Sequence, residues 1–337
     1  MQKKKSVRHT ERLAVTLLSL LFLTTAVFAT VKYVFRAPEI EQDKPVTPSE
    51  VTPAEEDGGT QEPLPAGRAR KQYCYTILVS GLDDGNGGSD TNMLVRFDAP
   101  NKTIDVVSLP RDTLLHNEYK NNKLNFAYAK GGTELLQSEI ENLLGVPVDF
   151  YVKVDLKGFI ALVDQIDGVD FDIPEDMDYD DPVQDLHIHF KKGPRHLNGQ
   201  EAMEVVRFRK NNDDGKIAYG GRADIGRIDT QQAFLKAVAK QLLQLGNLKN
   251  IPALVDIFCT YVKTDLTTGN LVWLGNEALN IGVENLSFHT LPGDGTGYYR
   301  KQSVYVLDPE ATLALVNEAL NPYEEPLTAE DLDILVP

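Results

Sequence analysis

The sequence predicts an α/β layered fold that is preceded by a single N-terminal transmembrane helix. Apolar runs typical of strands alternate with helical patterns from residue 73 onward, and this alternation is characteristic of a sheet covered by helices. An uncharged run of 19 residues from Leu13 to Val31 is long enough to cross a bilayer as a helix. A proline-rich acidic segment separates these two parts of the chain.

The N-terminal segment predicts how the chain is placed at the cell membrane. Residues 1–12 contain five Lys and Arg and one Glu, so this tail is expected in the cytoplasm and the rest of the chain outside the cell. Residues 13–35 are then the helix of a single-pass membrane protein. The alternative is a cleavable signal peptide with the cleavage site Val27-Phe28-Ala29, but the apolar run exceeds a usual signal core of roughly 7–15 residues.

Residues 36–72 are predicted to be a disordered extracellular tether. Between residues 37 and 72 there are six prolines, eight acidic residues and almost no large apolar side chains, so this segment buries too little surface to fold. The folded extracellular part is therefore expected as one domain over residues 73–337. Its cysteines, Cys74 and Cys259, fit either a disulfide outside the cell or two buried thiols, and the sequence leaves both open.

The first three elements of the domain are expected to be strands. Residues 73–82, YCYTILVSGL, form a continuous apolar run that ends in glycine, as buried strands often do. Residues 91–99 and 103–110 are two further apolar runs. Because Pro-Asn-Lys between them is a turn signal, this pair is expected to form a hairpin.

Helices and strands alternate through the middle of the domain. Residues 133–145 have helical spacing and a terminal glycine, and residues 148–156 alternate as a strand. Residues 157–168 are expected to be helical, and residues 169–174 extended. Strands that alternate with helices in this way predict the layered sheet.

The remainder of the domain is expected to be mainly helical. Asn198 is the predicted N-cap of a helix over residues 199–209. The other expected elements are a long helix at 224–246, two or three helices between 250 and 281, a strand at 284–293 and a helix at 309–321.

The charge of the chain limits its partners. The formal net charge is −16, which argues against a broad nucleic-acid footprint, so no nucleic-acid partner is expected. Against this acidic background, residues 191–227 contain nine Lys and Arg but only five Asp and Glu. This basic segment indicates a site for an anion.

A glycine-rich acidic loop lies within residues 80–100, SGLDDGNGGSDTNMLVRFDAP. Asp83 follows one predicted strand and Asp90 precedes the next, so their carboxylates bracket the turn and are candidate ligands of Mg²⁺. The loop lacks the P-loop signature, and Gly88 and Val95 occupy positions where an EF-hand needs ligands. A cluster of this composition is by itself most often a plain turn.

Arginines from three segments are predicted to form an anion site near this loop. Arg111 ends the third predicted strand beside an aspartate, where a local surface salt bridge is the alternative. Arg207 and Arg209 would point to one side in an extended helix exit. Arg222 and Arg227 precede or begin the next helix, whose free N–H groups favour anions. Together with carboxylate-bound Mg²⁺, such guanidinium groups predict a pyrophosphate site.

Two other kinds of site fit the sequence less well. His187 and His189 share one face of a predicted strand, with His196 nearby, but no third zinc ligand has a recognisable spacing. An exposed polar strand face is therefore favoured there. The sequence contains no G-x-S-x-G motif, so it does not predict a serine hydrolase of that type.

Six motifs in a fixed order carry a specific resemblance to a known family. They are GLD…SDTNMLVRFD, VVSLPRDT, KLNFAYAKGG, FYVKVDLKGFIALVDQIDGVDFDIP, HLNGQEAMEVVRFRK and DIGRIDTQQ. Between roughly Tyr75 and Leu243 the sequence resembles the LytR–CpsA–Psr family of cell-wall glycopolymer transferases. The resemblance implies a three-layer α/β/α sandwich with a mixed central sheet, and an extracellular catalytic domain at 73–337. It also implies an apolar pocket for a polyprenyl tail between sheet and helices.

The resemblance further implies roles for individual residues. Asp83 and Asp90 resemble the metal-site aspartates, for Mg²⁺ or, in its place, Mn²⁺. The implied catalytic residues are Asp83, Asp90, Arg111, Arg207 and Arg209. The implied pyrophosphate-binding residues are Arg111, Lys123, Arg207, Arg209, Arg222, Arg227 and Gln231. One departure is Thr230, where many members carry a second arginine, and Arg222 is the expected substitute.

The implied activity is transfer of a glycopolymer from a polyprenyl-pyrophosphate carrier to peptidoglycan at the membrane, with formation of a phosphodiester. Asp83 or Asp112 would then be the general base for the attacking sugar hydroxyl. The alternatives are a polyprenyl-pyrophosphate hydrolase and a non-catalytic lipid-headgroup receptor that regulates wall assembly. A DNA-binding role is not expected, because the cytoplasmic tail of residues 1–12 is far shorter than a domain of roughly 50 residues.

Overall fold

The computed structural model describes residues 36–40, 68–82, 89–183, 185–212, 223–242 and 251–337. The predicted transmembrane helix lies outside these ranges, and within them no helix is long and apolar enough to cross a membrane. The chain divides into two compact units, of which the larger, residues 49–265 and 278–337, contains the central sheet. In the smaller unit, Asn270 Nδ2 donates a hydrogen bond to the carbonyl oxygen of Arg36.

A six-stranded mixed sheet forms the centre of the larger unit, in the order β10-β3-β2-β1-β4-β9. The strands β1, β2 and β3 are consecutive antiparallel neighbours, whereas β4 runs parallel to β1 and β10 runs parallel to β3. The bounds are Cys74–Leu82 for β1, Ser89–Asp98 for β2, Thr103–Leu109 for β3, Phe150–Asp155 for β4, Val262–Thr264 for β9 and Leu286–Thr290 for β10. The predicted α/β fold with a mixed central sheet is thus confirmed.

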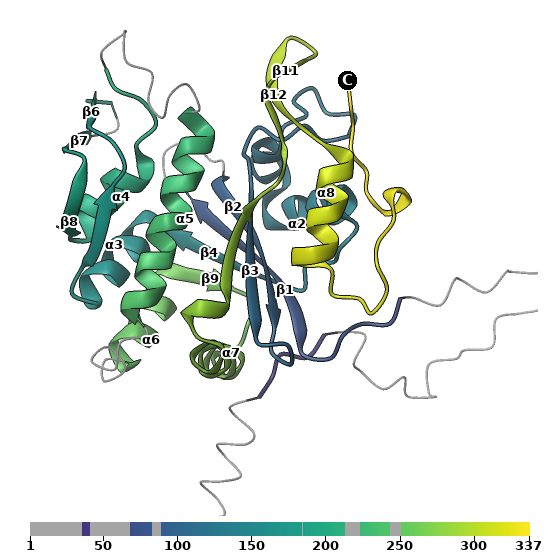
Figure 1. Ribbon diagram of the computed structural model, residues 1–337, viewed down its shortest axis with the longest axis horizontal. Helices are drawn as coiled ribbons and strands as arrows, with labels where there is room; N and C mark the ends of the chain where they lie inside the picture. The colour runs from purple at the N-terminus through teal and green to yellow at the C-terminus, as the bar shows by residue number, and fades with distance from the viewer. Residues whose placement is uncertain (1–35, 41–67, 83–88, 184, 213–222, 243–250) are drawn as a thin grey trace, which may run out of the picture. The chain divides into compact units, whose positions relative to one another are not determined.

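One face of the sheet is covered by α2, α8 and the π-helical segment η6, as Figure 1 shows. Their apolar side chains, among them Ile140, Leu143 and Leu320, form one core cluster with Leu78 and Leu94 of the sheet. The bounds are Leu124–Leu144 for α2, Pro309–Leu315 for α8 and Val316–Leu320 for η6. The chain also contains two short 3₁₀ segments, η5 (Val283–Asn285) and η7 (Ala329–Asp331).

The helix α2 differs from its prediction at its N-terminal end. The predicted helix began at Thr133, whereas α2 already begins at Leu124 and is kinked at Gly131 and Gly132. Gly132 has φ 66°, a conformation that glycine adopts without steric cost. The predicted start at Thr133 therefore coincides with a kink within α2.

A second core cluster is formed by α3, α4, α5 and two small two-stranded sheets. Phe208 and Phe234 are fully buried at its centre. The helices around it are α3 (Leu156–Gln165), α4 (Gly199–Arg207), α5 (Ala223–Leu242) and α6 (Ile251–Tyr261). The helix α7 (Thr268–Ile281) belongs mostly to the smaller unit. The two-stranded sheets pair β5 (Val169–Ile173) with β8 (Gly193–Leu197), β6 (Met177–Asp181) with β7 (Leu186–Phe190), and β11 (Gly293–Tyr299) with β12 (Gln302–Leu307).

The N-cap predicted for α4 is present. Asn198 accepts a hydrogen bond from the backbone N–H of Glu201, and the Glu201 side chain accepts one from the N–H of Asn198, so the two form a capping box. The helix ends at Arg207, two residues earlier than predicted, because Phe208 adopts an extended conformation and is buried in the core. This early end decides where the following arginine points.

The ordered contacts of the domain begin before residue 73. Arg68 pairs with Asp331, Arg70 pairs with Asp149, and Lys71 Nζ donates to the carbonyl oxygen of Asn321. Residues 68–72 are therefore held by the folded part of the chain, although their composition placed them in the tether. Cys74 is a free, buried thiol, and the side chain of Cys259 lies outside the described part.

Candidate functional site

A cavity of about 570 Å³ opens at the edge of the central sheet where β3 ends and β2 begins. Its walls come from the segment that follows β3, the N-terminal half of α5, the exit of α4 and the β11–β12 hairpin. The carboxyl ends of β1 and β3 meet at this edge, because the intervening β2 is antiparallel to both. This is the position where ligands bind in open α/β sheets.

Arg111 reaches the cavity from a turn at the end of β3. The turn is held by Thr113, whose backbone N–H and hydroxyl both donate to the carbonyl oxygen of Pro110, at 3.0 and 2.6 Å. The carbonyl oxygen of Arg111 accepts a hydrogen bond from the N–H of Asn125 at the start of α2. The backbone of this arginine is therefore fixed by both of its neighbouring elements.

Arg209 enters the cavity from the exit of α4, whereas Arg207 does not line it. Arg207 is the last residue of α4, and its Nη1 lies 3.7 Å from Sδ of Met203, one turn back. The sequence predicted that an extended exit would point both arginines to one side. In the structure Arg207 is the last residue of α4 and Arg209 lies in the segment that follows the helix, so that only Arg209 is among the residues that line the cavity.

Arg227 and Gln231 line the cavity from α5. They are four residues apart, so they lie on the same face of the helix. Gln231 Nε2 donates a hydrogen bond of 3.0 Å to the carbonyl oxygen of Val206. Gln231 thus connects α5 to the end of α4, next to the segment that carries Arg209.

Lys123 lies outside the cavity lining and pairs with a residue within it. Its Nζ is 3.3 Å from Oδ1 of Asp112, and the same oxygen is 3.6 Å from Nε of Arg111. Asp112 is about 29% exposed and faces the cavity. The Asp112 carboxylate therefore lies between these two cations at the cavity.

The acidic loop and one predicted arginine cannot be placed. Asp83 and Arg222 lie outside the described residues, and so does the side chain of Asp90. The backbone at Asp90 is part of β2, where Gly81 pairs with Thr91 but Leu82 pairs with Ser89. Asp90 is thus the extra residue of a β-bulge, a feature that often redirects a side chain next to an active site.

The floor of the cavity is polar and was not predicted. Asn92 is buried, and its Oδ1 accepts hydrogen bonds from the hydroxyls of Ser80 and Ser89, at 3.0 and 2.8 Å. Ser108 at the end of β3 accepts one from Gln232 Nε2. Polar residues that interrupt the ends of three apolar strands were the signal in the sequence for this floor.

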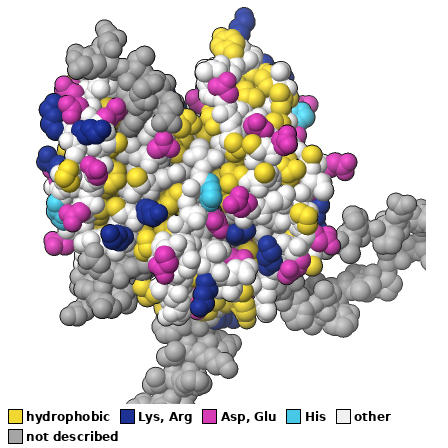
Figure 2. Space-filling model, viewed as in Figure 1, with side chains coloured by type: hydrophobic (Ala, Val, Ile, Leu, Met, Phe, Trp, Pro, Cys, Tyr) yellow, Lys and Arg dark blue, Asp and Glu magenta, His cyan; other side chains and the backbone are white. Residues whose placement is uncertain are grey.

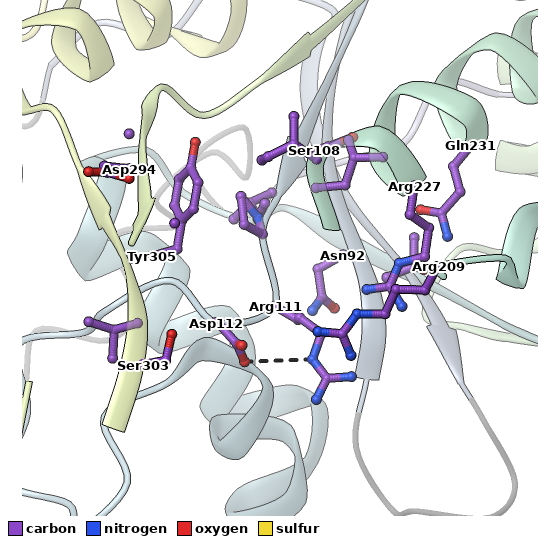
Figure 3. A pocket seen from close by; sticks show the side chains of 18 of the residues that line it. Asn92, Ser108, Arg111, Asp112, Arg209, Arg227, Gln231, Asp294, Ser303 and Tyr305 are labelled. Carbon is purple, nitrogen blue, oxygen red and sulfur yellow. Dashed lines mark ion pairs between the residues drawn. The ribbon is translucent and has the colours of Figure 1, made fainter. Parts of the chain in front are cut away.

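The β11–β12 hairpin forms the wall opposite the arginines and was missed by the sequence prediction. In Figure 3 Asp294, Ser303 and Tyr305 lie on one side of the cavity, and Arg209 and Arg227 lie on the other, with Arg111 and Asn92 towards them. The apolar alternation in QSVYVL, after a turn at Arg300 and Lys301, was the available signal.

Two groups of this wall have shifted pKa values. Hydrogen bonds from the side chain and backbone of Thr296 lower the pKa of Asp294, so its carboxylate is already engaged within its own loop. Burial raises the pKa of Tyr305, whose hydroxyl donates to the carbonyl oxygen of Leu291 at 2.9 Å. Both side chains shape the wall of the cavity.

Thr230, which stands where an arginine was expected, is buried in α5. Its hydroxyl donates a hydrogen bond of 2.9 Å to the carbonyl oxygen of Gly226 within the same helix. Thr230 is absent from the cavity lining, and among the described residues the cations that line the cavity are Arg111, Arg209 and Arg227.

The chain matches one family model and many known proteins. The model of the LytR_cpsA_psr family matches residues 37–320. TagV of Bacillus subtilis, named polyisoprenyl-teichoic acid–peptidoglycan teichoic acid transferase, is 32% identical over 255 residues, which are 72% of this chain and 62% of TagV. TagU of Bacillus cereus, which carries the same transferase name, is 33% identical over 67% of this chain and 71% of TagU.

A solved structure agrees with these sequence matches. The crystal structure of B. subtilis TagV superposes with a TM-score of 0.60 at 29% identity, and the match covers 71% of this chain and 92% of that chain. The likeness therefore covers most of this chain and nearly all of that structure.

Proposed function

The chain belongs to the LytR_cpsA_psr family, and from this membership we propose that it transfers a glycopolymer from a polyprenyl-pyrophosphate carrier to peptidoglycan. The observation that carries this proposal is the convergence of Arg111, Arg209 and Arg227, from three separate segments, on one cavity. The chain spans 62% of the length of TagV, so the activity in that protein's name is extended here as a proposal.

The arginine side of the cavity suits a diphosphate. Each guanidinium group presents a planar fork of N–H donors, which matches two phosphate oxygens. Three such groups on one wall neutralise much of the charge of a diphosphate and of the lipid phosphate that leaves it. The arginines come from the segment after β3, from the segment after α4 and from α5, and they lie together on one side of the cavity (Figure 3).

The apolar side of the same cavity suits the start of a polyprenyl chain. Leu109, Ile225, Ile228 and Val304 line it next to the arginines. Figure 2 shows apolar side chains bordering a hollow beside the β11–β12 hairpin, while charges of both signs are interspersed over the rest of this face. A ligand with a charged headgroup and a hydrocarbon tail matches this division, because the apolar side chains remove the first isoprene units from water.

Mg²⁺, with Mn²⁺ as a substitute, is part of the proposal as the metal ion of this site. Hard cations prefer oxygen ligands, and we propose the carboxylate of Asp90, whose backbone forms the bulge at the start of β2, as one of them. Asp83, at the other arm of the same loop, is proposed as the second acidic residue. When bound, the ion would neutralise charge on the diphosphate oxygens.

The reaction follows from what these side chains do. A hydroxyl group of peptidoglycan attacks the phosphorus on the glycan side, which forms a P–O bond and breaks the bond to the bridging oxygen. The lipid monophosphate leaves, and the arginines stabilise its negative charge. The hydroxyl proton passes to a carboxylate, for which we propose Asp112, because Lys123 and Arg111 hold it at the cavity.

The proposed placement of the chain completes this function. Residues 13–35 would anchor it in the cell membrane with residues 1–12 inside, so that the cavity stands outside the cell near its lipid substrate. The apolar run and its basic flank support this proposal.

A transfer assay with the full-length chain tests the function. We expect Mg²⁺-dependent covalent attachment of glycan from polyprenyl-pyrophosphate-linked glycan to purified peptidoglycan. Arg209→Ala should lower the rate roughly 10²–10³-fold, as the loss of one transition-state donor does. The matched control is Arg195→Ala, because Arg195 pairs with Glu201 on the surface, away from the cavity.

The other outcomes of this assay contradict the proposal. Release of phosphate-linked glycan without attachment would identify a hydrolase. Tight binding of the lipid without turnover would identify a receptor. Equal rates for Arg209→Ala and Arg195→Ala would show that the arginine cavity is not the site.

A further inference from the structure

The β6–β7 hairpin brings histidine and aspartate side chains together on one exposed face. The register pairs Asp180 with His187 and Asp178 with His189. Along β7 the alternate residues Leu186, Ile188 and Phe190 are buried, so both histidines project away from the core. The third ligand that the sequence did not reveal comes from β6, across the hairpin.

Three of these side chains form a compact donor group. One ligand atom each of Asp180, His187 and His189 lies within 4.8 Å of the others, and no other group of this kind occurs among the described residues. Nε2 of His189 is 3.4 Å from Oδ1 of Asp180, and Nδ1 of His187 is hydrogen-bonded to the same oxygen. All three side chains are about half exposed, so an ion can reach them from solvent.

We propose that Asp180, His187 and His189 bind a divalent transition-metal ion, for which Zn²⁺ is the best match. Two imidazoles and one carboxylate are a donor set that suits Zn²⁺. Metal–ligand bonds of about 2.0–2.1 Å in tetrahedral geometry place the donor atoms roughly 3.3 Å apart. The pair of His189 and Asp180 already has this spacing, and the His187 pair needs to open by less than about 1 Å when its shared proton leaves.

Asp178 supports this arrangement from outside. Its Oδ1 lies 2.8 Å from Nδ1 of His189, which directs the other ring nitrogen, Nε2, towards Asp180. Imidazoles that bind metals commonly have their second nitrogen held by a carboxylate in this way, which fixes the tautomer and the orientation of the ring. Asp178 is therefore a positioning residue of the proposed site and not a ligand.

An ordinary His–Asp pair on another two-stranded sheet, β5–β8, provides the contrast. His196 of β8 is opposite Asp170 of β5, and Nδ1 lies 2.8 Å from Oδ1, with both side chains exposed. This pair has the same register, distance and exposure as the pair of His189 and Asp178. It does not belong to a group of three donors, so it is a matched control within the chain.

The proposed ion would stabilise the segment that follows Arg209. Asn212 donates from its backbone N–H to the carbonyl oxygen of Asp178 and from Nδ2 to that of Asp180, both at 3.0 Å. Its Oδ1 accepts from the N–H of Asp180 at 2.7 Å. An ion that holds β6 and β7 together therefore also orders the strand edge against which residues 211–212 pack. This effect does not depend on the reaction proposed for the cavity.

Titration with ZnCl₂ tests the site. The full-length chain is purified without a histidine tag, freed of metals with EDTA, and titrated by calorimetry in excess MgCl₂, which saturates hard-cation sites. We expect one Zn²⁺ per chain. His187→Gln and His189→Gln should each weaken binding more than about 100-fold, and Asp178→Asn about 10–100-fold, the usual loss for a supporting carboxylate.

The control and a second readout keep the proposal falsifiable. His196→Gln should bind Zn²⁺ as the native chain does, and Zn²⁺ should raise the melting temperature of both but not of His187→Gln. Co²⁺ in place of Zn²⁺ should give a visible absorption band that the two ligand variants lack. Unchanged binding by a His187→Gln, His189→Gln double variant, or an equal loss in His196→Gln, would overturn the proposal.

Discussion

Two arginine–aspartate pairs in this molecule differ in their distance and in their exposure to solvent. Arg70 and Asp149 form a bidentate pair, with hydrogen bonds of 3.0 and 2.7 Å and side chains only 8% and 6% exposed. Arg111 and Asp112 approach no closer than 3.6 Å, and both are 29% exposed at the cavity. The residue types are the same, but the geometry and the surroundings differ.

The buried pair is closed by its neighbours. Asp149 also accepts hydrogen bonds from the backbone N–H and the hydroxyl of Thr76, at 2.8 and 2.9 Å, and Arg70 donates to the carbonyl oxygen of Cys74. Its charges are therefore used within the fold, where they fasten the residues before β1 to β4. The looser pair lies beside a cavity large enough for a ligand. We therefore expect the pair of Arg70 and Asp149 to stabilise the fold, and the pair of Arg111 and Asp112 to serve the binding of a ligand in the cavity.

We expect the largest effect on stability when the buried pair of Arg70 and Asp149 is broken. Arg70→Ala leaves the Asp149 carboxylate buried without its counter-ion, so we expect a loss of about 3–5 kcal/mol in the free energy of unfolding. Urea unfolding measures this loss. Arg195→Ala, which removes a more exposed pair with Glu201, should cost less than about 1 kcal/mol. Similar losses for both variants would contradict the distinction.

A change at the loose pair should affect activity instead of stability. Arg111→Ala should lower the rate of glycan transfer roughly 10²–10³-fold, because it removes a donor to the departing phosphate. Its free energy of unfolding should change by less than about 1 kcal/mol, because the pair is partly exposed and long. If Arg111→Ala unfolds as readily as Arg70→Ala, the pair is structural after all.

We expect the smallest effect at the pair of Arg68 and Asp331, which is short like the buried pair but partly exposed like the pair at the cavity. The hydrogen bonds from Arg68 lower the pKa of Asp331 to about 2. A lowered carboxyl pKa stabilises the fold above the unfolded value of about 3.9, and this contribution is lost as the pH falls from about 4 through 2. The urea midpoint of the native chain should therefore exceed that of Asp331→Asn at pH 6, and the difference should shrink over this interval.

Glu330→Gln is the control for that comparison, because Glu330 is exposed and adjacent in sequence. Its midpoint should follow the native curve throughout. A difference between native chain and Asp331→Asn that stays constant from pH 6 to pH 2 would show that the ion pair contributes no pH-dependent stability.

Local signals in the sequence predicted most of the sheet and its helices. The continuous apolar runs that became β1 and β3 need only their own composition to be recognised, and the capping box of Asn198 and Glu201 is contained in four residues. The elements that were missed depend on distant partners. The hairpin β11–β12 is one, and the first half of α2, which continues past Gly131 and Gly132, is another.

The sequence also predicted only a part of the candidate site. The sequence predicted that the end of β3 and the segments around α4 and α5 carry the basic residues of an anion site. It did not separate Arg209, in the cavity, from Arg207, which stays on the helix. That separation depends on the burial of Phe208, which ends α4 and is decided by packing against other elements.

By itself, the sequence determined the family, the order of strands and helices from β1 to β5, and which charged residues follow which strand, because hydrophobic periodicity and motifs act over short stretches of chain. Only the tertiary structure decided which charges share a space. It brought Arg111, Arg209 and Arg227 to one cavity, and through the register of β6 and β7 it placed Asp180 beside His187 and His189. The physical reason is that contacts between distant residues depend on the packing of the elements between them, and no local pattern contains that information.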